Sequence, residues 1–169
     1  MDMRDDDRLR QDRLVFYKTD IEKIDRILTE FLKLSQARCA LLVDKEGHLV
    51  TRAGLTEAVD LDTISALVAG AFAATKEMAK HLGEEEFSVL FHQGKKDSIH
   101  LTLIGERTLL TVIFDERTTI GMVRLYANEA AKKLGKVFAQ AGRTPDDEEL
   151  TEDFGEVAGD ALDQLFGED

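Results

Sequence analysis

The amino-acid sequence predicts an α+β fold in which three helices and five strands follow one another in the order αββαβββα. In three long segments, apolar residues recur at steps of three and four, which is typical of helices with one buried face. Between these segments lie short apolar or alternating runs joined by short polar links, which is typical of antiparallel strands. We therefore expect a five-stranded antiparallel sheet with helices on its faces, and the length of 169 residues suits one such domain.

The first part of the chain is predicted to form a helix and a hairpin. Isoleucine, leucine and phenylalanine recur at helical spacing over residues 17–35, which indicates a helix with one apolar face. Two short runs, residues 37–43 and 48–53, flank a polar turn at 44–47. Gly47 permits the positive φ that a tight hairpin turn needs, so the two runs are predicted to pair as strands.

A second helix is predicted over residues 62–82, and its side chains are unusual. Its predicted core face consists of Ile64, Leu67, Val68, Ala71, Thr75, Met78 and Leu82. The opposite face is small rather than charged and consists of Ala66, Gly70 and Ala73. A face turned to water normally carries Lys and Glu, which appear only from Lys76 and Glu77 onward. A small apolar face of this kind favours contact with another protein.

Three strands and a third helix are predicted for the next part of the chain. The strands are assigned to residues 98–104, 108–114 and 120–126, and the short links between them indicate an antiparallel meander. Alternation in the first of these strands indicates that one of its faces is solvated. The helix is assigned to residues 127–140, before a glycine and a proline that are expected to end it.

Acidic residues are concentrated in one part of the chain. The formal net charge is −12, and residues 144–169 hold eleven acidic side chains and no Lys or Arg. We therefore predict a charged, flexible extension over residues 1–15, a folded domain over 16–142, and an acidic disordered tail over 143–169. The charge argues against nucleic acid or an anionic membrane surface as the main partner.

The sequence contains no motif for enzyme chemistry. It lacks the glycine-rich phosphate loops and the common zinc patterns, and its four histidines share no ligand spacing. The single cysteine, Cys39, is predicted to be a buried, inert thiol inside a strand, and it excludes an internal disulfide framework. We therefore expect no cofactor, no metal and no active site, in a protein of the reducing cytoplasm.

Five segments carry a family resemblance, and they are Leu41–Gly47, Leu67–Ala74, Phe91–Ser98, Val112–Thr118 and Gly121–Leu125. In order and spacing they resemble the Roadblock/LC7 family, and within it the bacterial MglB-type proteins. The resemblance implies a profilin-like sandwich and a homodimer, in which an edge strand and the second helix join two protomers into one continuous sheet. The edge strand would be the one that carries Ile99, Leu101 and Leu103, whose pairing would remove an aggregation-prone edge.

The same resemblance implies regulation of a small GTPase. MglB-type proteins are GTPase-activating proteins for the Ras-like GTPase MglA and set front–rear polarity in motile bacteria. Two protomers bind one GTPase and reposition its own catalytic groups, so no catalytic arginine is nominated, although an arginine supplied in trans is the usual device. The expected GTPase-binding residues are Ala66, Gly70, Ala73, Lys76, Glu77 and, on the first helix, Lys23. The alternative for the small face is close helix packing within the dimer.

The acidic tail ends in a short segment, residues 160–166, in which Leu162, Leu165 and Phe166 stand at helical spacing. The segment resembles MglB tails and is predicted to fold into a groove of the GTPase or of a receiver-type signalling protein, the alternative being a solubilising tail. Two other functions stay open for the whole chain: a dimeric scaffold that tethers GTPase or signalling partners without affecting hydrolysis, and a small-molecule sensor. A location at a cell pole would follow from the partner network.

Overall fold

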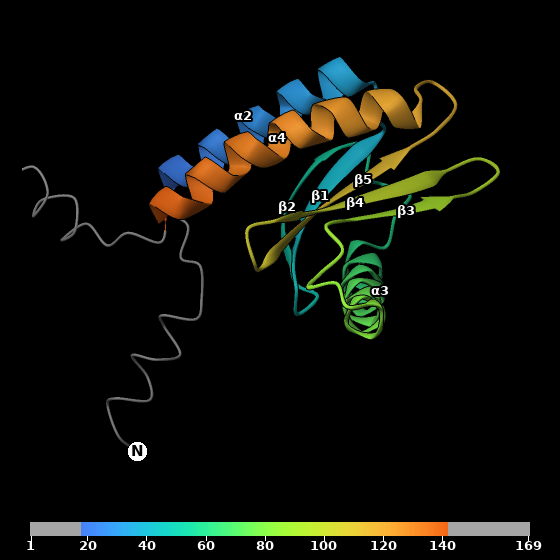
Figure 1. Cartoon of the computed structure of the whole chain (residues 1–169). Coiled ribbons are helices and arrows are strands. Elements are labelled where there is room, and N and C mark those ends of the chain that lie inside the picture. Colours follow the sequence, from blue (N-terminus) through green and yellow to red (C-terminus); the bar gives the residue numbers. More distant parts are fainter. Residues whose placement is uncertain (1–17, 142–169) are drawn as a thin grey trace, which may run out of the picture. The chain divides into compact units, whose positions relative to one another are not determined.

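Three helices and five strands follow one another in the predicted order in the computed structural model, which describes residues 18–141 (Figure 1). They are α2 (Lys18–Ser35), β1 (Cys39–Asp44), β2 (Leu49–Gly54), α3 (Leu61–Leu82), β3 (Val89–Gln93), β4 (Ser98–Ile104), β5 (Thr108–Phe114) and α4 (Ile120–Ala141). The internal contacts of the chain group Tyr17–Val137 into one compact unit. The predicted extension 1–15, the tail 143–169 and the motif Leu162, Leu165 and Phe166 lie outside the described residues.

The five strands form one antiparallel sheet in the order β2-β1-β5-β4-β3. β5 lies at the centre, where Leu110 pairs with Leu42 of β1 on one side and with Thr102 of β4 on the other. Every residue of β5 is buried, as expected for a strand that is covered on both faces. Helices α2 and α4 lie on one face of the sheet, and α3 lies on the other (Figure 1).

The hydrophobic core has a part on each face of the sheet. Toward α3, Val68 and Phe72 of the helix pack with Leu101 and Leu109 of the sheet. In the other helix layer, α2 and α4 contribute side chains with an exposed fraction of 0%, which are Ile24, Leu28, Val123 and Leu134. Each large apolar side chain buried in this way stabilises the fold by about 1.5–3 kcal/mol.

Two elements were assigned wrongly from the sequence, although the order of element types is correct. Residues 120–126, predicted as the last strand, form the first turns of α4, and the missing strand is β3 (Val89–Gln93). The buried residues of α4 stand at alternating steps of four and three, and they include Val123, Ala127, Ala130, Leu134 and Val137. Thr119 caps the helix, since its Oγ1 accepts the Met122 N–H at 3.3 Å. This continuous helical stripe outweighs the local strand-like composition.

The prediction that Ile99, Leu101 and Leu103 form a dimer edge is wrong. These residues belong to β4, which pairs with β5 on one side and with β3 on the other. Leu101 is 1% exposed and packs against the core beneath α3. Among the described residues, the edges of the sheet are β2 and β3. The error follows from the missed β3, because a strand whose neighbour is overlooked is taken for an edge.

His100 of β4 is buried on the sheet face away from α3, since it alternates with Leu101 along the strand. Its Nε2 lies 2.9 Å from Thr102 Oγ1, and no described residue is hydrogen-bonded to its Nδ1. Burial, and after it the positive charge of Arg124, lowers the pKa of His100 to about 4. The imidazole is therefore neutral in the folded protein at neutral pH.

We expect the free energy of unfolding to decrease as the pH falls below about 6.5. The unfolded histidine takes up its proton near pH 6.5, while the folded one does so only near pH 4, so the unfolded state binds more protons in this window. Between pH 7.5 and pH 5 the expected loss is about 2 kcal/mol. Urea unfolding across this range measures it, and His100→Leu should remove most of the pH dependence. An unchanged dependence in His100→Leu would assign the effect to other groups.

Candidate protein-docking surface

Helix α3 is capped at both ends. Asp60 Oδ1 accepts the Thr63 N–H at 3.2 Å, and Thr63 Oγ1 donates to Asp60 Oδ2 at 2.8 Å. The Thr63 side-chain hydrogen bond is the main cause that holds the pKa of Asp60 below its usual value. At the other end, Gly83 adopts a φ of 78° and donates its N–H to the Lys80 carbonyl at 3.2 Å.

The face of α3 that packs on the sheet differs from the predicted one. The buried residues are Leu61, Ser65, Val68, Ala69, Phe72, Thr75 and Ala79. Leu67, Met78 and Leu82, which were predicted to be core, are 63%, 54% and 73% exposed. Because apolar residues occur on nearly every side of this helix, their spacing alone does not decide which stripe is buried. Ser65 and Thr75 donate their hydroxyls to main-chain carbonyls of α3 and so are satisfied inside the core.

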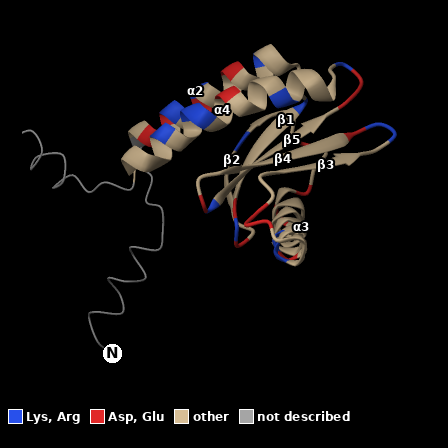
Figure 2. Cartoon of the chain, viewed as in Figure 1, with Lys and Arg blue, Asp and Glu red and all other residues tan. Residues whose placement is uncertain are grey.

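The exposed side of α3 is small and apolar. Its small residues are Ala66, Gly70 and Ala73. Leu67 and Met78 are exposed on the same helix, and no charged residue occurs between Asp62 and Lys76. Most of α3 is therefore tan, the colour of uncharged residues, in Figure 2. We call the set Ala66, Leu67, Gly70, Ala73 and Met78 the α3 outer face. An exposed helix face without charge is typical of a surface that another molecule covers.

Gly70 is not required by the packing of the chain itself, because a Cβ built there would meet no atom within 4 Å. Glycine in a helix interior costs about 1 kcal/mol relative to alanine. We therefore expect Gly70→Ala to raise the free energy of unfolding by about that amount, measured by urea or thermal unfolding. If the glycine serves a contact outside the chain, the same variant weakens partner binding although the fold is more stable. A destabilised variant would contradict the open environment of Gly70.

Strand β3 offers unpaired main-chain groups at the edge of the sheet. Among the described residues it pairs with β4 alone. The Ser88 carbonyl accepts the Leu103 N–H at 3.0 Å, so by the alternation of antiparallel strands the main-chain groups of Val89 and Phe91 point away from β4. Both side chains are 38% exposed, and Phe91 stacks on Phe114 with ring centroids 6.1 Å apart. The edge is therefore suited to pairing with a further strand.

The structure brings most of the predicted GTPase-binding residues to one helix but not all of them. Lys76 and Glu77 follow the α3 outer face, and each has an ion-pair partner, Glu86 at 3.9 Å and Lys80 at 2.9 Å respectively. Such exposed pairs contribute only about 0–1 kcal/mol. Lys23 lies on α2, on the opposite face of the sheet (Figure 1), so within one protomer it is not brought together with the α3 outer face.

The residues missed by sequence reasoning are the exposed apolar ones beside the small face. Leu67, Met78 and Leu82 were assigned to the core, and Val89 and Phe91 were not recognised as an edge strand. A signal for the edge was available, since the apolar run at residues 87–91 lies between an acidic loop and a glycine-containing turn. No comparable signal separates the exposed from the buried leucines of α3.

One group of described residues has the composition of a metal site, namely Asp44, Glu46 and His48, whose ligand atoms lie within 4.8 Å of one another. Asp44 Oδ1 accepts the N–H groups of Glu46 and His48 at 3.0 and 2.9 Å, which is the hydrogen bonding of the β1–β2 turn.

Cys39 is buried, as predicted, and burial raises the pKa of its thiol. None of the helices in the range 18–141 is long and apolar enough to cross a membrane.

The five-stranded antiparallel sheet and its three helices form a small α+β domain, whose candidate docking surfaces are the β3 edge and the α3 outer face. The chain belongs to the Roadblock/LC7 domain family, whose model matches residues 23–114. It also has the fold of profilin, since a Schizosaccharomyces pombe profilin superposes with a TM-score of 0.51 at 14% identity, covering 67% of this chain and 97% of that one.

Solved structures of MglB proteins are similar to this chain over most of its length. MglB of Myxococcus xanthus is 39% identical with a TM-score of 0.72, covering 78% of this chain and 98% of that one. The gliding protein MglB of Thermus thermophilus is 35% identical with a TM-score of 0.70, covering 75% and 96%. Among curated proteins, an uncharacterised protein of Methanocaldococcus jannaschii is 28% identical over 115 residues, which are 68% of this chain and 99% of that protein.

Proposed function

We propose that this protein is a GTPase-activating protein for a Ras-like small GTPase of the MglA type and that it acts as a homodimer. The similarity to MglB structures at 39% and 35% identity supports the proposal. The observation that carries it is the α3 outer face, which is exposed and uncharged and contains a glycine that the fold does not require. A switch region of a GTPase can approach the main chain of such a helix closely.

The proposed mechanism repositions the catalytic groups of the GTPase itself. An activator accelerates hydrolysis only if it binds the transition-state arrangement of the GTPase more tightly than the ground state. Arg117, at the turn before α4, is a poor candidate for an arginine supplied in trans, because its guanidinium donates to both Asp115 carboxylate oxygens at 3.0–3.2 Å. The same hydrogen bonding raises the pKa of Arg117.

The proposed homodimer is formed by β3 of each protomer, with α3 beside it. Two copies of an antiparallel edge strand can pair about a two-fold axis, which gives a self-complementary interface and one continuous sheet. The exposed Val89 and Phe91 and the open main-chain groups of β3 support this interface. One of the similar structures is of MglB in a tetrameric arrangement, at 35% identity and a TM-score of 0.72. We therefore propose that the oligomeric state of this chain be measured for assemblies larger than a dimer as well.

The test is GTP hydrolysis by the Ras-like GTPase of the same organism, with and without this protein at two protomers per GTPase. Stimulation of tenfold or more is expected, which corresponds to at least about 1.4 kcal/mol off the barrier. A stable complex without stimulation would instead identify a scaffold that tethers the GTPase. Absence of any complex would overturn the proposal. In cells, the proposed role is control of polarity and motility.

A further inference from the structure

The N-terminal end of the α3 outer face is bordered by acidic side chains. Glu57, Asp60 and Asp62 are all exposed, in the link before α3 and in its first turn. No Lys or Arg occurs between Arg52 and Lys76 in the sequence, so these three carboxylates have no basic neighbour along the chain. Asp60 is fixed in place because its carboxylate caps the helix.

The β1–β2 turn touches the same end of α3. A Cβ built on Gly47 would lie 3.1 Å from Ala66 Cα, so the turn packs directly against the main chain of the helix. The turn carries Asp44, Lys45 and Glu46, which is one more acid than base. Its close approach therefore adds to the negative charge at this end of α3 and does not offset it.

The C-terminal end of α3 is acidic as well. The last turns of the helix and the loop that follows hold four glutamates against two lysines and one histidine. Lys76 and Lys80 are already ion-paired with two of these glutamates, which leaves Glu84 and Glu85 exposed and without an ion-pair partner among the described residues. The Glu84 N–H donates to the Ala79 carbonyl at 2.9 Å, which holds these two acids directly after the helix.

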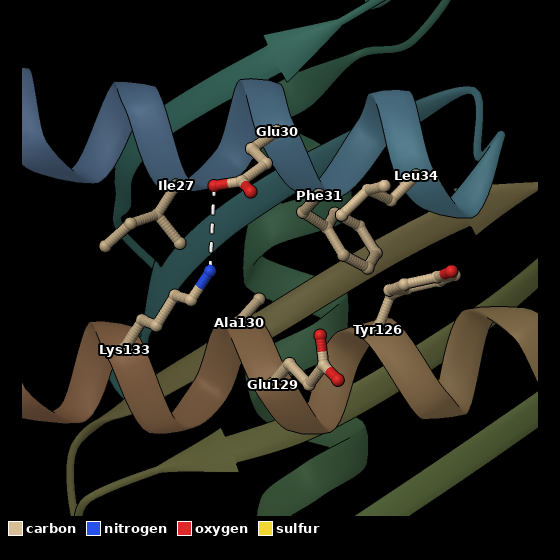
Figure 3. A pocket seen from close by; sticks show the side chains of 8 residues that line it. All are labelled: Ile27, Glu30, Phe31, Leu34, Tyr126, Glu129, Ala130 and Lys133. Atoms are coloured by element: carbon tan, nitrogen blue, oxygen red, sulfur yellow. Dashed lines mark ion pairs between the residues drawn. The ribbon is translucent and has the colours of Figure 1, made fainter.

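The helices on the other face of the sheet have a different charge pattern. On α2, acidic and basic residues are interspersed, and Glu30 Oε2 pairs with Lys133 Nζ of α4 at 3.6 Å (Figure 3). Of the formal net charge of −12, residues 144–169 account for −11, so the rest of the chain is close to neutral. The acids at both ends of α3 are therefore a local feature of that helix and not a consequence of the net charge.

We propose that the α3 outer face binds a partner surface that is apolar at its centre and basic at two places about 30 Å apart, the length of the helix. This rests on the proposed function, in which the partner is the GTPase, and it names the charges that the GTPase carries. Leu67 and Met78 would contact the apolar centre. Lys or Arg side chains of the partner would meet Asp62 at one end and Glu84 and Glu85 at the other. Charges at the rim of an interface act mainly on the rate of association and on the choice of partner.

A second copy of α3 is disfavoured as the occupant of this face. Whether two α3 helices pack parallel or antiparallel, an acidic end of one meets an acidic end of the other, and like charges across an interface cost binding free energy. The charges therefore favour contact with another protein over helix packing within the dimer as the role of Ala66, Gly70 and Ala73.

The test is the rate of association between the full chain and the GTPase loaded with a non-hydrolysable GTP analogue, measured by stopped-flow fluorescence over a range of salt concentrations. We expect the association rate constant of the unmodified chain to fall as salt rises. Glu84→Lys/Glu85→Lys should lower it about tenfold at low salt and weaken its salt dependence. Glu57→Gln/Asp62→Asn should also lower it, and this variant keeps the capping Asp60.

The matched control is Glu22→Lys/Glu129→Lys, which makes the same change of charge as Glu84→Lys/Glu85→Lys at exposed positions of α2 and α4. It should leave the association rate constant within about twofold, because salt screens charges on the other sheet face. Three results would overturn this inference while the proposed function stands: a rate that does not depend on salt, a rate that rises with salt, or a Glu84→Lys/Glu85→Lys chain that binds as fast as the control.

Two further outcomes are distinguishable from these. Absence of any complex with the GTPase at every salt concentration would overturn the proposed function, and this inference with it. A Glu84→Lys/Glu85→Lys chain that dissociates into monomers in sedimentation would place the acidic C-terminal end of α3 in the dimer interface, which contradicts the inference as well.

Discussion

Ala73→Arg is expected to leave the fold intact, to weaken binding of the GTPase at least a hundredfold, and so to abolish stimulation at concentrations where the unmodified chain is active. Ala73 is exposed on α3, and arginine is a good helix former, so the isolated chain accommodates the change. In a complex that covers the α3 outer face, the guanidinium would be buried without a partner, which costs about 3–5 kcal/mol. Hydrolysis assays and a binding titration with the GTPase measure the loss, and circular dichroism checks the fold.

Asn128→Arg is the matched control for this variant. It adds the same charge at an exposed helical position on α4, on the other sheet face, and should stimulate the GTPase as the unmodified chain does. The mass of Ala73→Arg in solution then separates the two interpretations of the small face. A variant that stays dimeric and no longer binds supports a GTPase contact, whereas one that becomes monomeric assigns the face to helix packing within the dimer. Full stimulation by Ala73→Arg would contradict both.

The order of element types was predictable because helical and strand periodicities differ clearly in this sequence. The assignment of particular segments was less secure where composition and periodicity disagree. Residues 120–126 are rich in strand-forming side chains, but Val123 belongs to a buried stripe that is recognisable only when Ala127, Ala130 and Leu134 are read with it. Treating the segment as a strand hid β3, and the missing β3 then made β4 look like an edge.

The candidate docking surface was predictable in part for a similar reason. The absence of charge between Asp62 and Lys76 predicted from the sequence that one side of α3 is a contact surface, and the structure leaves that side exposed. Its rotation on the sheet was not predictable, because leucines lie on the exposed side as well as the buried side, and only packing against residues such as Leu101 selects Val68 and Phe72. The separation of Lys23 from the α3 outer face likewise depends on which sheet face each helix covers, which is a long-range property.

Val89→Pro is expected to separate the proposed dimer into folded monomers. The main-chain groups of Val89 point away from β4, so the missing N–H and the proline ring affect the open side of β3 and not the ladder to Thr102. In a two-fold pairing each protomer loses one hydrogen bond of about 1 kcal/mol, and the two rings add steric conflict, so dimer affinity should fall on the order of a hundredfold. Sedimentation or light scattering over a dilution series measures the change.

Val89→Thr is the matched control, since it keeps the N–H and a β-branched side chain and should remain dimeric. The stimulation assay extends the argument from assembly to function. If two protomers must engage one GTPase, monomeric Val89→Pro loses stimulation although its α3 outer face is unaltered. A higher concentration of the variant should restore stimulation only where dimers form again. A folded Val89→Pro that remains dimeric would move the interface away from β3, and a monomer with full activity would show that one protomer is sufficient.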